Sequence, residues 1–364
     1  MKVSDFDFEL PETLIAQEAE ERGRSRLLVL RRDTGAVEHA MFADLERFLR
    51  PGDLLVLNDT RVFPGRLLGH RDSTGGAVEC LLMGYPRMVV LAGEQGSSSS
   101  LEHGAQECDV LVRKGTKWPF GTRMTFERDG LLLRGEFVNT HHRGRRTLRL
   151  WTDDPAGVTA LLDRIGHVPL PPYIKREDRP ADRERYQTVY AAARGSIAAP
   201  TAGLHFTPEQ LAALRAAGVE QQTVTLHVGY GTFKPVRVDR VEDHQVDPEA
   251  YTVTAEAAQA LTRARREGRR IVAVGTTTVR VLESLDISPA GEVSPGAGDT
   301  RLFIHPGHQF QLVGGLITNF HLPKSSLLML VAAFAGREPV LAAYREAVAH
   351  GYRFYSYGDA MLVV

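Results

Sequence analysis

The feature that most constrains the fold is an alternation of helix and strand signals in the second half of the chain. The segment TPEQ at 207–210 combines a helix N-cap, a first-position proline and a capping-box glutamine, and Gly218 supplies the stop. A strand-like run follows at 222–228, and a second helix and strand extend from Thr254 to the run at 270–275. Such repeated cycles predict a largely parallel sheet with helices, either open or closed into a barrel.

More helices are predicted over 276–285, 325–336 and 339–351, and a last strand near 360–364. Residues 61–150 differ, because they contain short alternating runs separated by Gly, Ser and charged residues, as expected of an antiparallel β domain. These runs lie at 78–83, 88–93, 109–114, 123–128, 131–138 and 145–151. We therefore expect a barrel-like α/β domain made of 1–60 and 151–364, with residues 61–150 forming an inserted all-β domain, a small β-barrel.

The composition indicates a globular protein and argues against secreted, disulfide-rich and membrane-spanning classes. A chain of 364 residues with 43% hydrophobic and 24% charged residues is long enough for two globular domains. Cys80 and Cys108 form no C-x-x-C pair, which argues against a disulfide framework and a zinc site and favours a reducing compartment. No secretory signal is visible, and the apolar run 327–335 is too short to cross a bilayer. A cytoplasmic protein, without membrane contact and monomeric, is expected.

The charge distribution is uneven although the net charge is −1. Residues 1–60 carry 8 basic and 13 acidic groups, whereas residues 61–150 carry 14 basic and 9 acidic groups. A basic excess confined to one segment is what a polyanionic partner needs. Simple solvation of a β-rich domain explains the same excess equally well.

Several predicted strands end in polar residues on one face. In open α/β sheets and α/β barrels, ligands bind at the carboxyl ends of the strands, so these residues are candidates for one composite site. A single polar pair is more readily explained as a satisfied strand end, but the recurrence on three strands favours a site. The pairs that share a face are Asp59 with Arg61, Thr225 with His227, and Asn319 with His321.

Other candidates lie in segments rich in Gly, Thr and aromatic residues. Histidine suits proton transfer near neutral pH, although a buried structural histidine is the more common case. The GTTT segment at 275–278 begins a helix, where N–H groups bind phosphate or carboxylate, and a plain threonine cap fits it equally well. The turns around Gly203 and Gly229 bring backbone close to a ligand. The segment YQT at 186–188 can stack on a base, or pack as a half-buried helix. These residues alone indicate a two-domain α/β enzyme with a nucleotide-like ligand.

Ten blocks resemble, in order, the S-adenosylmethionine:tRNA ribosyltransferase-isomerase family of queuosine biosynthesis. They include GDLLVLNDTRV, GSIAAPTAGLHFT, VTLHVGYGTFKPV, VGTTTVRVLES, GGLITNFHLPKSSLLMLVAAFAG and YRFYSYGDAMLV. The resemblance implies an α/β barrel-like domain with an inserted β-barrel. It also implies transfer of the ribosyl group of S-adenosylmethionine to 7-aminomethyl-7-deazaguanine at the tRNA wobble position. The expected products are epoxyqueuosine, adenine and methionine.

This chemistry needs a base for the ribose methylene beside the sulfonium and an acid for adenine departure. The resemblance implies S-adenosylmethionine as a co-substrate and no metal or other cofactor. Aromatic faces such as Tyr186 or Phe233 would favour the sulfonium cation. Candidate catalytic residues, with roles unassigned, are Asp59, His205, His227 and His321. Candidate substrate-binding residues are Arg61, Tyr186, Gln187, Thr188, Thr201, Gly203, Gly229, Thr232, Thr276, Thr277, Arg280, Asn319 and Asp359.

A tRNA partner calls for phosphate contacts, because these position an RNA while the pocket selects the base. The candidates are basic residues of the inserted domain and of the segment after PLPPY: Arg143, Arg145, Arg146, Arg149, Lys175, Arg176 and Arg179.

The chain departs from the family pattern at three places. Gly23 replaces an acidic residue, Ala19 replaces a proline, and Asp247 stands where a second histidine is usual. The last change puts in doubt any mechanism that needs that histidine. Two other functions stay open: an enzyme acting on a free nucleoside, and an RNA-binding protein without catalysis. A reaction that depends on modified tRNA would argue against the free-nucleoside enzyme. Release of adenine from S-adenosylmethionine would argue against an RNA-binding protein without catalysis.

Overall fold

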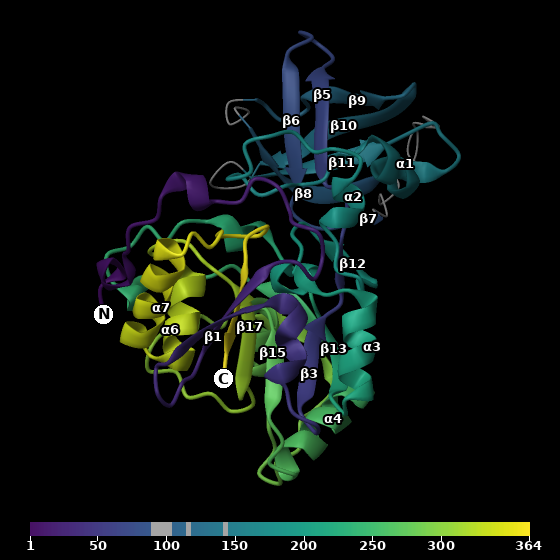
Figure 1. Ribbon diagram of the computed structural model, residues 1–364. Helices are drawn as coiled ribbons and strands as arrows, with labels where there is room; N and C mark the ends of the chain where they lie inside the picture. Colours follow the sequence, from purple (N-terminus) through teal and green to yellow (C-terminus); the bar gives the residue numbers. More distant parts are fainter. Residues whose placement is uncertain (89–103, 114–117, 141–144) are drawn as a thin grey trace.

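The computed structural model describes residues 1–88, 104–113, 118–140 and 145–364. It contains a large α/β part and a β-barrel beside it (Figure 1). The predicted fold class, α/β with an inserted all-β domain, is confirmed.

The α/β part is built on a nine-stranded mixed sheet. Its central strands β13, β3, β15 and β17 run parallel, and β18 pairs antiparallel with β17 but parallel with β1. The outer pairs β14–β16 and β1–β2 are antiparallel. The pairing order has two ends, so the sheet is open and more mixed than the alternation predicts. In order, the strands are β16 (Gly296–Thr300), β14 (Glu249–Val253), β13 (Glu220–Leu226), β3 (Leu54–Asn58), β15 (Ile271–Val274), β17 (Gly315–Asn319), β18 (Ala360–Val363), β1 (Arg26–Leu30) and β2 (Val37–Met41).

Helices cover both faces of the sheet, because side chains of successive strand residues point to opposite faces. On β3, Leu54 and Val56 pack in one core, whereas Leu55 and Leu57 pack in the other. The first core is covered by α4 (Ala255–Arg266), α5 (Thr276–Leu282), α6 (Ser326–Ala335) and α7 (Arg337–Ala349). The second is covered by α3 (Pro208–Ala216) and the 3₁₀ segments Phe42–Arg47 and Thr201–His205.

Three of the predicted helices begin at side-chain caps, whereas α5 follows Gly275 and α7 follows Gly336 without one. Thr207 Oγ1 accepts a hydrogen bond from the Gln210 main-chain N–H at 3.1 Å, and Gln210 Oε1 accepts one from the Thr207 N–H at 3.1 Å. This reciprocal pair satisfies donors that the first turn of α3 leaves free. Thr254 and Ser325 cap α4 and α6 in the same way, each accepting from the N–H three residues ahead at 3.2 Å.

The inserted part is a six-stranded antiparallel barrel. It closes because β11 pairs with both β10 and β8, while the short strand β7 (Arg87–Met88) adds to β8. Helix α1 (Gly157–Ile165) packs Leu161 and Leu162 against the barrel core. The strand β5 was not among the predicted runs, and most of the predicted run 88–93 lies outside the described residues. The barrel strands are β5 (Arg66–Arg71), β6 (Ala77–Leu82), β8 (Gln106–Val112), β9 (Arg123–Arg128), β10 (Leu131–Thr140) and β11 (Arg145–Trp151).

A two-stranded parallel sheet lies where the chain enters and leaves the barrel. Its strands are β4 (Thr60–Val62) and β12 (Ala193–Ser196), and the short helix α2 (Asp182–Arg185) precedes it. The barrel strands span Arg66 to Trp151, and the predicted domain limits, 1–60 with 151–364 against 61–150, stay a prediction. Within the described residues, no single helix is long and apolar enough to cross a membrane; only α6 with α7 passes that test, as a pair bent by 117°.

Candidate active site

A cavity of about 580 Å³, counted together with the solvent space at its opening, lies at the carboxyl ends of β15 and β17. The sequence pattern predicts a ligand site at this edge of the sheet. Four segments supply most of its lining: the start of α5, the end of β17 with the turn after it, residues 198–202, and residues 355–356. Of the predicted site residues, this cavity brings together Tyr186, Thr201, Thr232, Thr276, Thr277, Asn319 and His321.

His321 is a buried histidine in the cavity wall. Its Nε2 lies 2.9 Å from Thr318 Oγ1, and its main-chain N–H donates to Tyr344 Oη at 3.2 Å. Burial lowers the pKa of His321 to about 3, so the ring is neutral at pH 7. The neutral imidazole keeps a lone pair that can accept a proton, although a pKa of about 3 makes it a weak base in this environment.

Tyrosines form an aromatic wall of the cavity. The rings of Tyr173 and Tyr355 lie 3.7 Å apart between centroids, and Tyr186 is fully buried beside them. Tyr355 has a φ of +73°, and its carbonyl accepts a hydrogen bond from Asn319 Nδ2 at 2.9 Å. Burial raises the pKa of Tyr173, Tyr186 and Tyr355, so all three are neutral phenols. Tyr173 and Tyr355 were missed, although both lie in segments noted for their sequence, PLPPY and YRFYSYG.

Two of the three predicted polar pairs, Asp59 with Arg61 and Thr225 with His227, do not line the cavity. Polar side chains at these strand ends form hydrogen bonds between neighbouring strands instead. Thr225 Oγ1 donates to Asp59 Oδ1 at 2.6 Å, and Thr60 Oγ1 lies 2.8 Å from His227 Nδ1. Burial lowers the pKa of His227, and the nearby Asp59 carboxylate opposes that shift. Asp59 and His227 therefore lie at the predicted sheet edge, in contacts between neighbouring strands.

A second cavity, of about 430 Å³, shares Thr232 and Leu327 with the first. Its buried carboxylate, Glu249, accepts hydrogen bonds from the Gly229 N–H at 2.8 Å and from Thr232 Oγ1 at 3.3 Å, and forms an ion pair with Arg280. Arg280 also donates to two main-chain carbonyls at 3.0 and 3.3 Å. The predicted residues Gly229, Thr232 and Arg280 thus meet around one carboxylate.

Some predicted residues hold the chain near the cavity. Gln187 binds the main-chain N–H and C=O of Val62 at 3.0 and 2.8 Å, so its amide acts like a strand partner. Gly203 is packed so closely that a Cβ there would lie 2.0 Å from Tyr190 Oη and 2.8 Å from Thr188 Cγ2. Thr188 itself is buried. Hydrogen bonding thus explains the residue type at 187, and close packing explains it at 203.

Three predicted site residues lie outside both cavities: His205, Asp359 and Arg61. His205 Nδ1 is 2.8 Å from Ser25 Oγ, and burial lowers the pKa of His205 to about 4. Asp359 is buried and accepts hydrogen bonds from Arg26. Arg61 is exposed on β4. Among the described residues, the linings of the two cavities include none of these three.

The predicted phosphate contacts have partners within the chain wherever they are described. Arg145 pairs with Asp247 at 3.3 Å, and Arg146 is buried and donates to the Arg145 carbonyl. Arg149 binds Glu107, Lys175 binds Glu12, Arg176 binds Asp182, and Arg179 binds Glu18. The Asp182 carboxylate raises the pKa of Arg176. Arg143 lies outside the described residues, as does the side chain of Phe233.

Comparison with known proteins gives full-length matches. Residues 3–363 match the family model described as "Queuosine biosynthesis protein". The S-adenosylmethionine:tRNA ribosyltransferase-isomerases of Moorella thermoacetica and Carboxydothermus hydrogenoformans are 49% and 50% identical to the chain, and each alignment covers 100% of both proteins. A crystal structure of an S-adenosylmethionine tRNA ribosyltransferase from Thermotoga maritima is 39% identical, with a TM-score of 0.54, and covers 99% of this chain and 100% of that one.

Proposed function

The chain belongs to the S-adenosylmethionine:tRNA ribosyltransferase-isomerase family of queuosine biosynthesis, and we propose that it performs this reaction in the cavity at the carboxyl ends of β15 and β17. The two substrates are S-adenosylmethionine and tRNA. In detail, the ribosyl group goes to 7-aminomethyl-7-deazaguanine at the wobble position and becomes the epoxycyclopentanediol of epoxyqueuosine. Adenine and methionine leave, and the reaction itself requires no metal.

The lining of the cavity supports S-adenosylmethionine as its ligand. Neutral aromatic faces attract cations, so the wall of Tyr173, Tyr186 and Tyr355 suits a sulfonium. A sulfonium there places the ribose within the same cavity.

One observation carries the assignment of the proton acceptor. Of the four candidates Asp59, His205, His227 and His321, the cavity is lined by His321, and no described residue of its lining is a carboxylate. We propose that the neutral His321 ring receives the proton of the ribose methylene next to the sulfonium. Thr318 positions this ring through its bond to Nε2. The start of α5, with Thr276 and Thr277, supplies further polar contacts to the substrates.

The tRNA must present its wobble base to this cavity. An enzyme that acts on a base takes it out of the stack, and the single-stranded anticodon loop permits this. We propose that the RNA backbone crosses the junction of barrel and sheet, where Arg61 is exposed on β4. The candidates for phosphate contacts stay Arg143, Arg145, Arg146, Lys175 and Arg176. Those that the structure describes must give up their hydrogen bonds or ion pairs within the chain before they can bind a phosphate. The buried thiols Cys80 and Cys108 fit a cytoplasmic protein, which we expect to act as a monomer.

Incubation of the protein with S-adenosylmethionine and tRNA tests this function. We expect adenine, methionine and epoxyqueuosine in equal amounts, formed only with tRNA that carries the aminomethyl base. Adenine formed with the free nucleoside alone would indicate the nucleoside-modifying alternative. Tight tRNA binding without any adenine would indicate an RNA-binding protein.

A further inference from the structure

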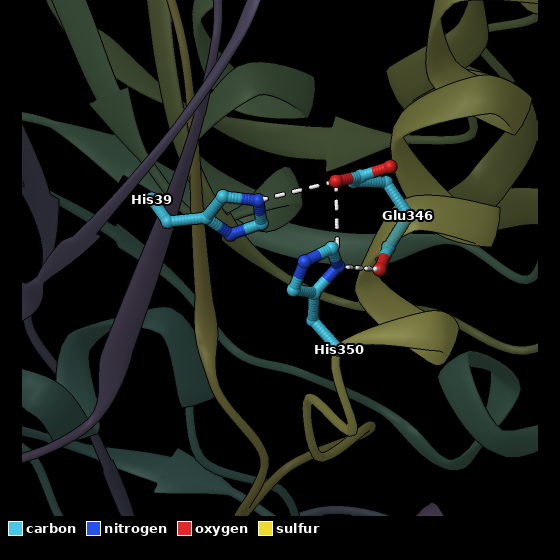
Figure 2. A group of neighbouring side chains, drawn as sticks. All are labelled: His39, Glu346 and His350. Atoms are coloured by element: carbon cyan, nitrogen blue, oxygen red, sulfur yellow. Dashed lines mark hydrogen bonds and ion pairs between the residues drawn. The ribbon is translucent and has the colours of Figure 1, made fainter.

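Two histidines and a glutamate converge away from both cavities. His39 lies on β2 and Glu346 on α7 (Figure 2). His350 directly follows the last residue of α7, four residues after Glu346, so the two share one face of the helix. His39 Nε2 lies 3.4 Å from Glu346 Oε1, and His350 Nδ1 lies 3.3 Å from the same oxygen. One ligand atom of each residue lies within 4.8 Å of the other two.

Tyr352 holds the ring nitrogen of His39 that does not face Glu346. Its Oη lies 2.8 Å from His39 Nδ1, and His39 Nε2 is the nitrogen that faces the Glu346 carboxylate. A polar partner on the second ring nitrogen is typical of histidines that bind metals.

The spacing of the three groups favours a tetrahedral transition metal. Zinc binds imidazole nitrogen and carboxylate oxygen at about 2.0–2.2 Å, which places tetrahedral neighbours about 3.3–3.5 Å apart. The separations of 3.3 and 3.4 Å around Glu346 Oε1 agree with that value. The imidazole rings of His39 and His350 lie side by side, with centroids 4.6 Å apart. Rings this close can each give one nitrogen to the same cation.

We propose that His39, Glu346 and His350 form a binding site for a divalent transition metal such as Zn²⁺, with the fourth position open to water. Imidazole ligands favour Zn²⁺ over Mg²⁺ and Ca²⁺, which prefer oxygen. His350 Nδ1 exchanges its bond to the Glu346 carbonyl, 3.0 Å away, for the metal. The ion would connect edge strand β2 to the end of α7. None of the three residues is among the described residues that line the cavities, so the site is independent of the proposed reaction.

Metal titration of the full-length protein tests this site. After treatment with a chelator, Zn²⁺ binding is followed by calorimetry. Co²⁺ is used as a spectroscopic probe of the coordination geometry. We expect one ion per chain, the strong visible bands of tetrahedral Co²⁺, and a Tm raised by a few degrees. His39→Gln and His350→Gln should each weaken binding at least tenfold, whereas His70→Gln, at an exposed histidine of the barrel strand β5, should leave it unchanged.

Several outcomes would overturn the proposal. These are no saturable Zn²⁺ binding, equal affinity in the wild type and in both variants, or equal binding of Mg²⁺. Circular dichroism and the Tm of each variant without metal show whether it is folded. If one variant is misfolded, Glu346→Gln replaces it, because the amide keeps the size of the side chain while it removes the charged ligand.

Discussion

Arg145 Nη2 lies 3.3 Å from Asp247 Oδ2, which joins barrel strand β11 to the wall of the second cavity. Lys234 binds the same carboxylate oxygen. The family resemblance leads us to expect a histidine at position 247, and this chain instead has an anionic contact between its two parts there. An arginine expected to bind RNA phosphate is therefore already engaged with the α/β part.

This ion pair should contribute little to stability. Both side chains are more than a third exposed, and exposed pairs are screened and typically worth less than about 1 kcal/mol. We expect a double-mutant cycle of Arg145→Ala and Asp247→Asn, measured by urea unfolding, to give a coupling below that value that shrinks in 1 M salt. Arg149→Ala, which breaks a pair within the barrel, is the matched control. A coupling above about 2 kcal/mol that ignores salt would show that the contact is a buried structural link.

Gly203→Ala should destabilise the protein by about 1–3 kcal/mol, the usual cost of overpacking. The added Cβ would meet Tyr190 Oη at 2.0 Å. Tyr190→Phe removes that oxygen, which is buried without a hydrogen-bond partner, so this change alone should be nearly neutral. We expect the double variant to recover part of the lost stability in thermal unfolding, because the contact with Thr188 Cγ2 at 2.8 Å remains. If Gly203→Ala is as stable as the wild type, the glycine serves the ligand and not the packing.

Acid should destabilise the fold through its buried histidines. The pKa is about 4 for His205 and about 3 for His321, both below the ordinary value of 6.5, so folding favours the neutral rings. Their contribution is complete above pH 6.5 and is lost as the pH falls towards those values. Between pH 7.5 and 5, each histidine should account for up to about 2 kcal/mol of lost stability. Urea midpoints of His321→Gln should fall less over this range, and an unchanged fall would contradict the lowered pKa.

Arg61→Ala should weaken tRNA binding and lower the slope of log K against log salt by about one, because one phosphate contact is lost. Filter binding at several salt concentrations measures both quantities. Arg215→Ala, at an exposed arginine near the end of α3, is the control. Affinity for S-adenosylmethionine alone should not change. If both variants behave like the wild type, the RNA takes another path over the protein.

The elements that could be predicted are those with local signals. Capping residues such as Thr207, Thr254 and Ser325 mark helix starts by bonds within one turn, and these starts are confirmed. The antiparallel pairing of β18 with β17 could not be predicted, because pairing direction depends on the path of the chain across α6 and α7. The strand β5 was missed because RLLGHR shows no strict alternation and contains a glycine.

The site could be predicted only in part for a similar reason. Strand alternation shows that Asp59 and His227 lie at the correct sheet edge, but it does not show that Thr225 and Thr60 already satisfy them. Tyr355 reaches the cavity from a turn with positive φ near the end of the chain, and no local pattern marks that position. Partners that are far apart in sequence are visible only once the chain is folded.

The most direct test of the central claim, that the cavity is where ribosyl transfer occurs, is the single-turnover rate of epoxyqueuosine formation by His321→Gln. Glutamine can keep a bond to Thr318 but cannot take the proton, and general bases contribute about 10²–10⁴-fold to rates. With saturating S-adenosylmethionine and modified tRNA, we predict a loss of at least a hundredfold, and wild-type rates for the control His70→Gln. A His321→Gln rate within threefold of the wild type would contradict the claim.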